Sequence, residues 1–202
     1  FQEYPDRYTA WWGIDTLPCV NELDESFLQF IIDGEDSVIA HWLRAGADGF
    51  RLDVADELPD AFIARLRRRM KEIDPQALLI GEVWEDASNK CSYNVRRRYF
   101  TGGELDSVMN YPFRRALIDF VTGRDGGEAL RDTVMAIAEN YPPEVLQTLM
   151  NFLSTHDTPR ILTLLGCPNP PERKEDRAAF RLSPESRELA LKRLFCAAFL
   201  QF

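Results

Sequence analysis

The chain has 202 residues, of which 45% are apolar and 28% are charged, so it contains enough apolar material for one globular core. Its formal net charge of −9 argues against a nucleic-acid partner and an anionic membrane surface, and is compatible with a neutral substrate. The four cysteines form no C-x-x-C pair and there are only two histidines, which argues against a metal site. Such cysteines are typical of free thiols in a reducing, cytoplasmic compartment, although disulfides also fit this spacing. No apolar run reaches membrane-spanning length.

The first 48 residues predict a loop followed by two helices. Residues 1–21 are irregular and lead into a short segment near Ile14 that is a candidate strand. Apolar residues between Phe27 and Leu43 have helical spacing, and Gly34 divides this region into two helices. The aromatic residues of the initial loop are Phe1, Tyr4, Tyr8, Trp11 and Trp12.

Residues 49–57 (GFRLDVADE) predict a strand that places two charged side chains on one face. After Gly49, apolar residues alternate with Arg51, Asp53 and Ala55, which is the period of a β-strand. A buried carboxylate is costly without a partner, and Arg51 is the obvious partner of Asp53. Taken alone, this stretch fits a structural ion pair as well as it fits an active site.

A helix and a second strand follow. Pro59 suits the first turn of a helix that ends at Asp74-Pro75. The residues that share one apolar face of this helix are Phe62, Leu66, Met70 and Ile73. Residues 78–83 are a continuous apolar strand interrupted only by Glu82. A right-handed crossover places two such strands side by side and parallel.

The rest of the chain continues this alternation. The expected elements are a polar loop (85–103), a strand end that packs in the core (106–111), two helices (113–121 and 130–141), a strand that ends at His156-Asp157, and a surface loop (166–181). A last helix begins at Ser183-Pro184. Its expected buried side chains are Leu189, Leu191, Leu194, Phe195, Ala198 and Phe199.

Three of the predicted strand ends carry a carboxylate, namely Asp53, Glu82 and Asp157. In a parallel barrel all carboxyl ends of the strands lie on one face, where these groups would converge. The stretches GFRLDVADE, GEVWE and FLSTHDTPR occur in that order and resemble three sequence regions that define the α-amylase family of glycoside hydrolases. The stretch TLPCVN at 16–21, after Trp11-Trp12-Gly13, resembles the extra region of its neopullulanase, maltogenic amylase and cyclodextrinase branch.

The resemblance implies an α/β fold, as a partial (β/α)8 TIM barrel from roughly strand 3 to the helix after strand 7. A closed barrel of this kind takes about 250 residues. We therefore expect residues 1–202 to be a central fragment of one catalytic barrel domain, with the N-terminal and C-terminal parts of the barrel missing. We expect the isolated fragment to be inactive and to self-associate through exposed sheet edges. A homo-oligomer is therefore also compatible with the sequence.

The resemblance also implies roles for the three carboxylates. Retention at the sugar needs a nucleophile and a proton donor about 5–5.5 Å apart. Asp53 would be the nucleophile, Glu82 the general acid and then the base, and Asp157 a ligand of sugar hydroxyls that favours the transition state. Arg51 is expected to keep Asp53 ionised by charge pairing, and apolar surroundings are expected to keep Glu82 protonated.

Four further residues are candidates for substrate binding: Arg51, His156, Glu57 and Trp84. His156 would donate hydrogen bonds to sugar hydroxyls, and Glu57 and Trp84 would line the side that receives the leaving sugar. Each has a structural alternative. Arg51 would then serve only an ion pair, His156 and Trp84 would belong to the core, and Glu57 would stabilise a helix N-terminus.

The predicted function is a retaining glycoside hydrolase that cleaves α-glucosidic bonds in α-glucans such as cyclodextrins, pullulan or maltooligosaccharides. One alternative is an α-glucanotransferase with the same carboxylates, in which a sugar replaces water. Another is a non-catalytic carbohydrate-binding relative, which would be expected to lose one or more of the carboxylates. No cofactor is expected, and the sequence does not decide between α-1,4 and α-1,6 bonds.

Overall fold

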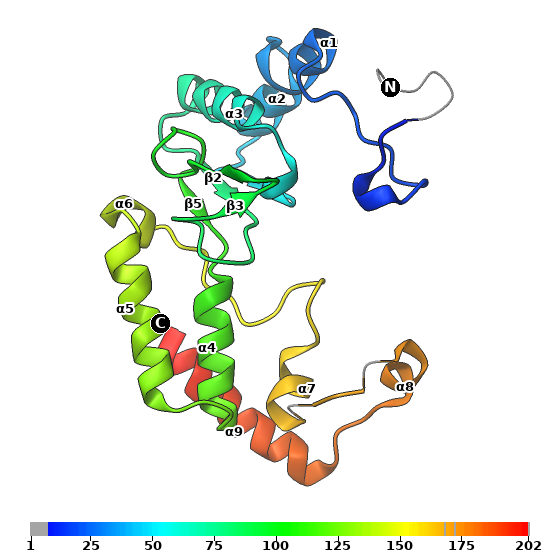
Figure 1. Cartoon of the computed structure of the whole chain (residues 1–202), viewed down its shortest axis with the longest axis vertical. Coiled ribbons are helices and arrows are strands. Elements are labelled where there is room, and N and C mark those ends of the chain that lie inside the picture. The colour runs from blue at the N-terminus through cyan, green and yellow to red at the C-terminus, as the bar shows by residue number, and fades with distance from the viewer. Residues whose placement is uncertain (1–7, 168, 172, 202) are drawn as a thin grey trace.

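The computed structural model describes residues 8–167, 169–171 and 173–201, and it combines a short parallel sheet with a group of helices. The sheet and helices α1 to α3 occupy one end of an elongated molecule, and α4, α5, α7 and α9 occupy the other (Figure 1). Phe1 and Tyr4, expected in the aromatic loop, lie outside the described residues. No helix in the described part of the chain is long and apolar enough to cross a membrane.

The sheet contains the parallel strands β1 (Gly49–Leu52), β2 (Leu78–Gly81) and β5 (Ser107–Val108), side by side in chain order. Gly49 lies opposite Leu78 in the pairing of β1 with β2, which confirms the expected strand–helix–strand unit. Beyond β5, Met150 forms one parallel bridge with Met109, the residue that follows β5. The order and direction of these strands are those of consecutive strands in a barrel.

The helices alternate with these strands along the chain. Their bounds are α1 (Glu25–Leu28), α2 (Val38–Arg44), α3 (Asp60–Ile73), α4 (Tyr111–Thr122), α5 (Gly127–Asn140), α6 (Pro143–Leu146), α7 (Ile161–Gly166), α8 (Lys174–Ala179) and α9 (Pro184–Gln201). Short turns of other helix types are η1 (Trp11–Gly13), η2 (Gln29–Asp33) and η3 (Ala55–Glu57). The predicted division near Gly34 is confirmed, since this residue ends η2 before α2 begins.

Helix α3 packs its predicted apolar face on the sheet. Phe62, Leu66 and Met70 are buried together with Leu79 of β2. Fully burying an apolar side chain of this size stabilises the fold by about 1.5–3 kcal/mol. This packing sets β1 beside β2 and therefore fixes the positions at which the two strands end.

The buried face predicted for α9 is wrong in part. Leu189, Phe195 and Phe199 are exposed, the last to 83%, whereas Ala190 and Ala197 are buried. Helix α9 contacts α7 and α4 along one face, where small side chains allow close approach. Leu194 also packs in this contact, whereas Leu189, Phe195 and Phe199 lie outside it.

Three loop and strand predictions also differ from the structure. Residues 8–21 contain η1 and a bridge between Ala10 and Pro18, so the candidate strand near Ile14 is wrong. The expected loop at 85–103 contains the antiparallel hairpin of β3 (Cys91–Ser92) and β4 (Val95–Arg96), and helix α8 interrupts the loop expected at 166–181. These elements are too short to give a clear sequence pattern. Contacts with the turn after β1 hold both η1 and the hairpin.

The strand predicted to end at Asp157 is reduced to the bridge at Met150. Asn110 N–H donates to Met150 O at 2.9 Å, and Met150 N–H donates to Val108 O at 3.1 Å. The chain then leaves the sheet, and a turn between Thr155 and Thr158 carries the last carboxylate. Hydroxyl side chains that bond to the nearby backbone compete with strand pairing in this way.

Candidate active site

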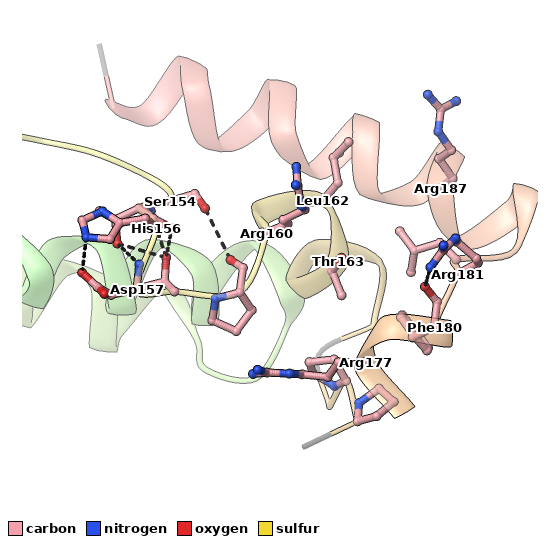
Figure 2. Close-up of a pocket in the computed structure, with 16 residues that line it drawn as sticks. Ser154, His156, Asp157, Arg160, Leu162, Thr163, Arg177, Phe180, Arg181 and Arg187 are labelled. Atoms are coloured by element: carbon pink, nitrogen blue, oxygen red, sulfur yellow. Dashed lines mark hydrogen bonds and ion pairs between the residues drawn. The ribbon is translucent and has the colours of Figure 1, made fainter. Parts of the chain in front are cut away.

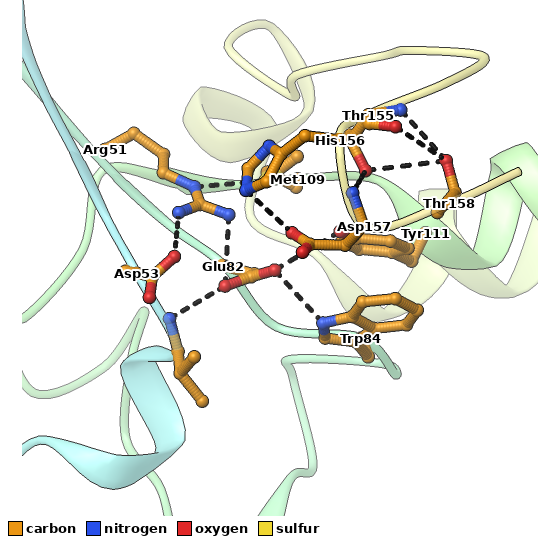
Figure 3. A network of polar contacts seen from close by, with 11 residues as sticks. Arg51, Asp53, Glu82, Trp84, Met109, Tyr111, Thr155, His156, Asp157 and Thr158 are labelled. Atoms are coloured by element: carbon orange, nitrogen blue, oxygen red, sulfur yellow. Dashed lines mark hydrogen bonds and ion pairs between the residues drawn. The ribbon is translucent and has the colours of Figure 1, made fainter. Parts of the chain in front are cut away.

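Arg51, the third residue of β1, contacts two carboxylates at the ends of neighbouring strands. Its Nη1 donates to Asp53, and its Nη2 lies 3.0 Å from Oε2 of Glu82 (Figure 3). Asp53 follows β1 and its side chain is 67% exposed, whereas Glu82 follows β2 and its side chain is 3% exposed. One guanidinium therefore holds an accessible and a buried carboxylate close together.

Both oxygens of Glu82 accept hydrogen bonds. Val54 N–H donates to Oε2 at 2.8 Å, and Trp84 Nε1 and the Tyr111 hydroxyl donate to Oε1 at 3.1 and 3.3 Å. The expectation of apolar surroundings for Glu82 is therefore wrong. A carboxyl group in a buried position needs such partners, because losing hydration without them is costly.

The backbone turns sharply directly after Asp53. Val54 has φ 40° and ψ 64°, a left-handed conformation that is strained for a β-branched residue. The turn directs Val54 N–H to the Glu82 side chain, and Ala55 N–H donates to the Glu82 backbone oxygen at 3.1 Å. The left-handed turn thus links the segment after Asp53 to the end of the neighbouring strand.

An aromatic stack lies beside Glu82. The rings of Trp84 and Tyr111 stack with centroids 4.2 Å apart (Figure 3). Phe152 meets Tyr111 edge-on at 4.7 Å. Burial, with a further contribution from Glu82, raises the pKa of Tyr111, so its hydroxyl keeps its proton. The expected core packing of Tyr111 is confirmed, since it is buried with Met109 and Phe152, but its contact with Glu82 was not predicted. Its place directly after a strand end was the available signal.

Asp157 and His156 reach the same site from the turn that follows Met150. His156 Nε2 lies 3.0 Å from Asp157 Oδ2, and the His156 side chain is 78% exposed, which excludes a core histidine. A cleft of about 840 Å³ brings together six of the seven predicted site residues. They are Asp53, Glu57, Glu82, Trp84, His156 and Asp157. Arg51 lies behind them, in contact with Asp53 and Glu82.

Glu57 is held at the edge of this cleft by two aromatic residues. Trp12 Nε1 donates to its Oε1 at 3.1 Å, and the Tyr93 hydroxyl lies 2.6 and 2.8 Å from its two oxygens. The hydrogen bond to Glu57 raises the pKa of Tyr93. Trp12 and Tyr93 were not among the predicted site residues. Both lie in segments predicted as loops, and the resemblance of the stretch after Trp12 to an extra region of one family branch was the available signal. The contacts with Glu57 do not depend on a helix dipole.

A second pocket, of about 1080 Å³, adjoins the site on the side of α7 and α8 (Figure 2). His156 and Asp157 line both hollows, so the two are continuous around this turn. The arginines of this pocket are Arg160, Arg177, Arg181 and Arg187. In Figure 2 their guanidinium groups point in different directions, so they do not define a single anion site.

Metal-binding groups are absent from the described part of the chain, in which no three His, Cys, Asp or Glu side chains are placed to hold an ion. The four cysteines, all within the described ranges, are free. The cleft brings together the carboxylates of Asp53, Glu82 and Asp157, and the Trp84 indole and Tyr111 hydroxyl donate hydrogen bonds to Glu82.

Comparison with known proteins places these features in a family. Residues 29–183 match the alpha-amylase catalytic domain. The chain is 35% identical over 98% of its length to an amylopullulanase from Thermoanaerobacter thermohydrosulfuricus, and 40% identical over 76% of its length to neopullulanase 2 from Thermoactinomyces vulgaris. It spans 14% and 24% of these two proteins.

Comparison of the fold with solved structures supports the same family. The structure of the type III pullulan hydrolase from Thermococcus kodakarensis matches 95% of the chain with a TM-score of 0.71 and 27% sequence identity, and the chain covers 30% of that protein. The strands and helices described above are accordingly part of a (β/α)8 barrel. The chain belongs to the α-amylase family of glycoside hydrolases.

Proposed function

We propose that the protein carrying this chain is a retaining glycoside hydrolase that cleaves α-glucosidic bonds in α-glucans such as cyclodextrins, pullulan or maltooligosaccharides. The observation that carries the proposal is the pairing of Asp53 and Glu82 by one guanidinium in a cleft that also receives Asp157. Relatives named amylopullulanase, neopullulanase 2 and cyclomaltodextrinase support the substrate class. Residues 1–202 would form a central part of one catalytic barrel domain.

In the first step, the Asp53 carboxylate attacks the anomeric carbon while Glu82 gives its proton to the glycosidic oxygen. The bond to the leaving sugar breaks, and a covalent glycosyl ester of Asp53 remains. In the second step, Glu82 takes a proton from water, which attacks the same carbon and releases Asp53. Two inversions give net retention, and each group ends in its starting state.

The surroundings suit this sequence of steps. Arg51 stabilises the Asp53 carboxylate both before attack and as the leaving group of the second step. Trp84 presents a partly exposed ring on which the apolar face of a sugar stacks, supported from behind by Tyr111. Asp157 and His156 are exposed in the same cleft, where they bind sugar hydroxyls.

The first test is the release of reducing sugar from β-cyclodextrin, pullulan and maltoheptaose by the complete protein. We expect turnover of at least one glucan, and we expect Glu82→Gln to lower it by about 10²–10⁴-fold, the range of general acid–base catalysis. Asp36→Asn is the control, because Asp36 is almost fully exposed and forms an ion pair with Arg44, outside the cleft. No turnover of any of the three by the folded wild-type protein would contradict the proposal.

A substrate with a good leaving group separates the role of Glu82 as the acid from the role of Asp53 as the nucleophile. Fluoride leaves α-maltosyl fluoride without needing a proton, so Glu82→Gln should retain attack on this substrate. Asp53→Asn should lose it, because no nucleophile remains. An equal loss of initial fluoride release in both variants would contradict the assignment of acid and nucleophile. Sugar chains longer than the substrate among the products would instead favour the glucanotransferase.

A further inference from the structure

The backbone turn that follows Asp53 is braced from outside by one buried arginine. Arg97 directly follows strand β4 of the hairpin, and it is 8% exposed. We propose that Arg97 is a positioning residue that fixes the candidate nucleophile by holding this turn. The inference rests on the proposed function, since it assigns Arg97 a part in that same reaction.

The contacts of Arg97 converge on three backbone carbonyl groups. Its Nη1 donates to Asp56 O at 3.2 Å, and its Nη2 donates to Ala55 O at 3.2 Å and to Leu58 O at 2.7 Å. The same nitrogen lies 2.9 Å from Asp60 Oδ1 at the start of α3. One planar cation with several fixed donors thus spans η3 and the beginning of the next helix.

This turn needs an external brace because it begins with a strained residue. Val54 adopts the left-handed conformation between Asp53 and η3, and such strain persists only where the surrounding structure enforces it. Glu57 N–H donates to Val54 O at 3.0 Å, which connects Val54 to the far end of η3. By holding the carbonyls of η3, Arg97 keeps the backbone from relaxing at Val54.

Other residues of the hairpin region secure the same turn through Asp56. Lys90 Nζ lies 3.0 Å from Asp56 Oδ2, and the Tyr99 hydroxyl donates to Oδ1 at 2.5 Å. Ser92 Oγ donates to Asp56 O at 3.2 Å. The Arg97 guanidinium also lies over the Tyr99 ring, 5.1 Å from its centroid. Arg97 is the member of this set whose side chain binds several carbonyls of the turn.

Loss of the brace would act on the chemistry through geometry. Without Arg97, the carbonyls of Ala55, Asp56 and Leu58 would lose a common donor, and Val54 would relax toward an unstrained conformation. Asp53, one residue before Val54, would then shift relative to Arg51 and Glu82. Trp84, His156 and Asp157 lie on other segments and would stay in place. Glu57 belongs to η3, but Trp12 and Tyr93 also hold it, so we expect a smaller effect on substrate binding than on the chemical step.

The test compares Arg97→Lys with Arg96→Lys in the complete protein. Lysine keeps the charge at position 97 but loses the planar fork, and Arg96 is an exposed neighbour on β4. We expect Arg97→Lys to lower kcat on the preferred glucan by about 10–100-fold, the effect of a misplacement of about 1 Å, with a smaller change in KM because only Glu57 of the binding residues lies on this turn. Arg96→Lys should match the wild type.

A second substitution shows whether Arg97 acts through the strained turn. Glycine adopts the left-handed conformation without steric cost, so we expect Val54→Gly to recover kcat by at least about threefold in the Arg97→Lys background. Unchanged kcat per folded Arg97→Lys molecule, or no recovery in the double variant, would overturn the positioning role. No turnover by the wild-type protein would overturn the proposed function, and the inference with it.

Discussion

At the scale of single residues, the site depends on donors that surround Glu82. Arg51 shares its guanidinium between Asp53 and Glu82, while Tyr111 gives Glu82 a hydrogen bond from the first residue of α4. Because burial keeps the Tyr111 hydroxyl protonated, this donor remains available across neutral pH. Glu82, the proposed acid–base group, is thus held in place from both β1 and α4.

Replacing Tyr111 by phenylalanine removes this donor and leaves the aromatic stack on Trp84 in place. We expect kcat/KM to fall by about fivefold to thirtyfold, because a lost hydrogen bond to a buried carboxyl group costs about 1–2 kcal/mol. Since the pKa of Tyr111 is raised above its usual value of about 10, the loss should be constant between about pH 5 and pH 9. Initial rates across this range give the measurement.

Tyr141→Phe is the matched control for this substitution. Burial raises the pKa of Tyr141 to about 12, and its hydroxyl accepts a hydrogen bond from Ala87 N–H at 3.0 Å, outside the cleft. This variant should lose stability and keep kcat/KM. An unchanged kcat/KM in Tyr111→Phe would show that the contact with Glu82 has no part in the reaction.

At the scale of elements, the pairing of β1 with β2 brings Asp53 and Glu82 to the same edge of the sheet. Gly49 begins β1 with φ 154°, and a Cβ atom on it would lie 2.0 Å from Leu78 O. A side chain at this position cannot be accepted without moving the backbone of one strand. The leading glycine of the sequence stretch therefore serves the close approach of two strands.

Gly49→Ala should separate the two strands at this end and strongly destabilise the fold. We expect the free energy of unfolding to fall by more than about 4 kcal/mol, because losses of this size arise from backbone strain or severe core defects. Gly127→Ala, at the first residue of α5, is the control with the opposite sign, since an alanine in a helix stabilises by about 0.4–1 kcal/mol. Urea unfolding measures both, and equal midpoints would contradict the prediction.

At the scale of the whole molecule, stability at neutral pH is reduced by a buried carboxyl group. Glu104 is 1% exposed, and its Oε2 has no hydrogen-bond partner in the described part of the chain. Burial raises the pKa of Glu104, Asp60 adds to this effect, and Arg97 and Arg98 oppose it. The folded state therefore holds this proton to a higher pH than the unfolded state.

Glu104→Gln should remove this pH dependence. In the wild type, the folded state binds more protons than the unfolded state above the usual carboxyl pKa, so the Glu104 contribution to stability falls as pH rises. We expect Tm of Glu104→Gln to exceed that of the wild type at pH 7, with a smaller difference at pH 4. The exposed Glu139→Gln should shift Tm little at either pH, and a Glu104→Gln difference that grows toward acid pH would contradict the prediction.

The sequence by itself determined the family, the strand–helix–strand unit and the places of Asp53 and Glu82 after their strands. The family was readable from the resemblance of three short stretches to known sequence regions. The strand–helix–strand unit was readable from spacing along the chain, as in the helical period of Phe62, Leu66 and Met70. Such spacing is readable because chain neighbours stay neighbours once a helix or strand forms.

Only the tertiary structure decided which distant residues meet. Arg51 contacts Glu82 as well as Asp53, Glu57 is held by Trp12 and Tyr93, and the hairpin after β2 braces the turn at Val54. It likewise left Phe195 and Phe199 of α9 exposed, because a different face of the helix, with Ala190 and Leu194, makes the contact. Such contacts depend on how loops and helices are placed against one another, which no local pattern specifies.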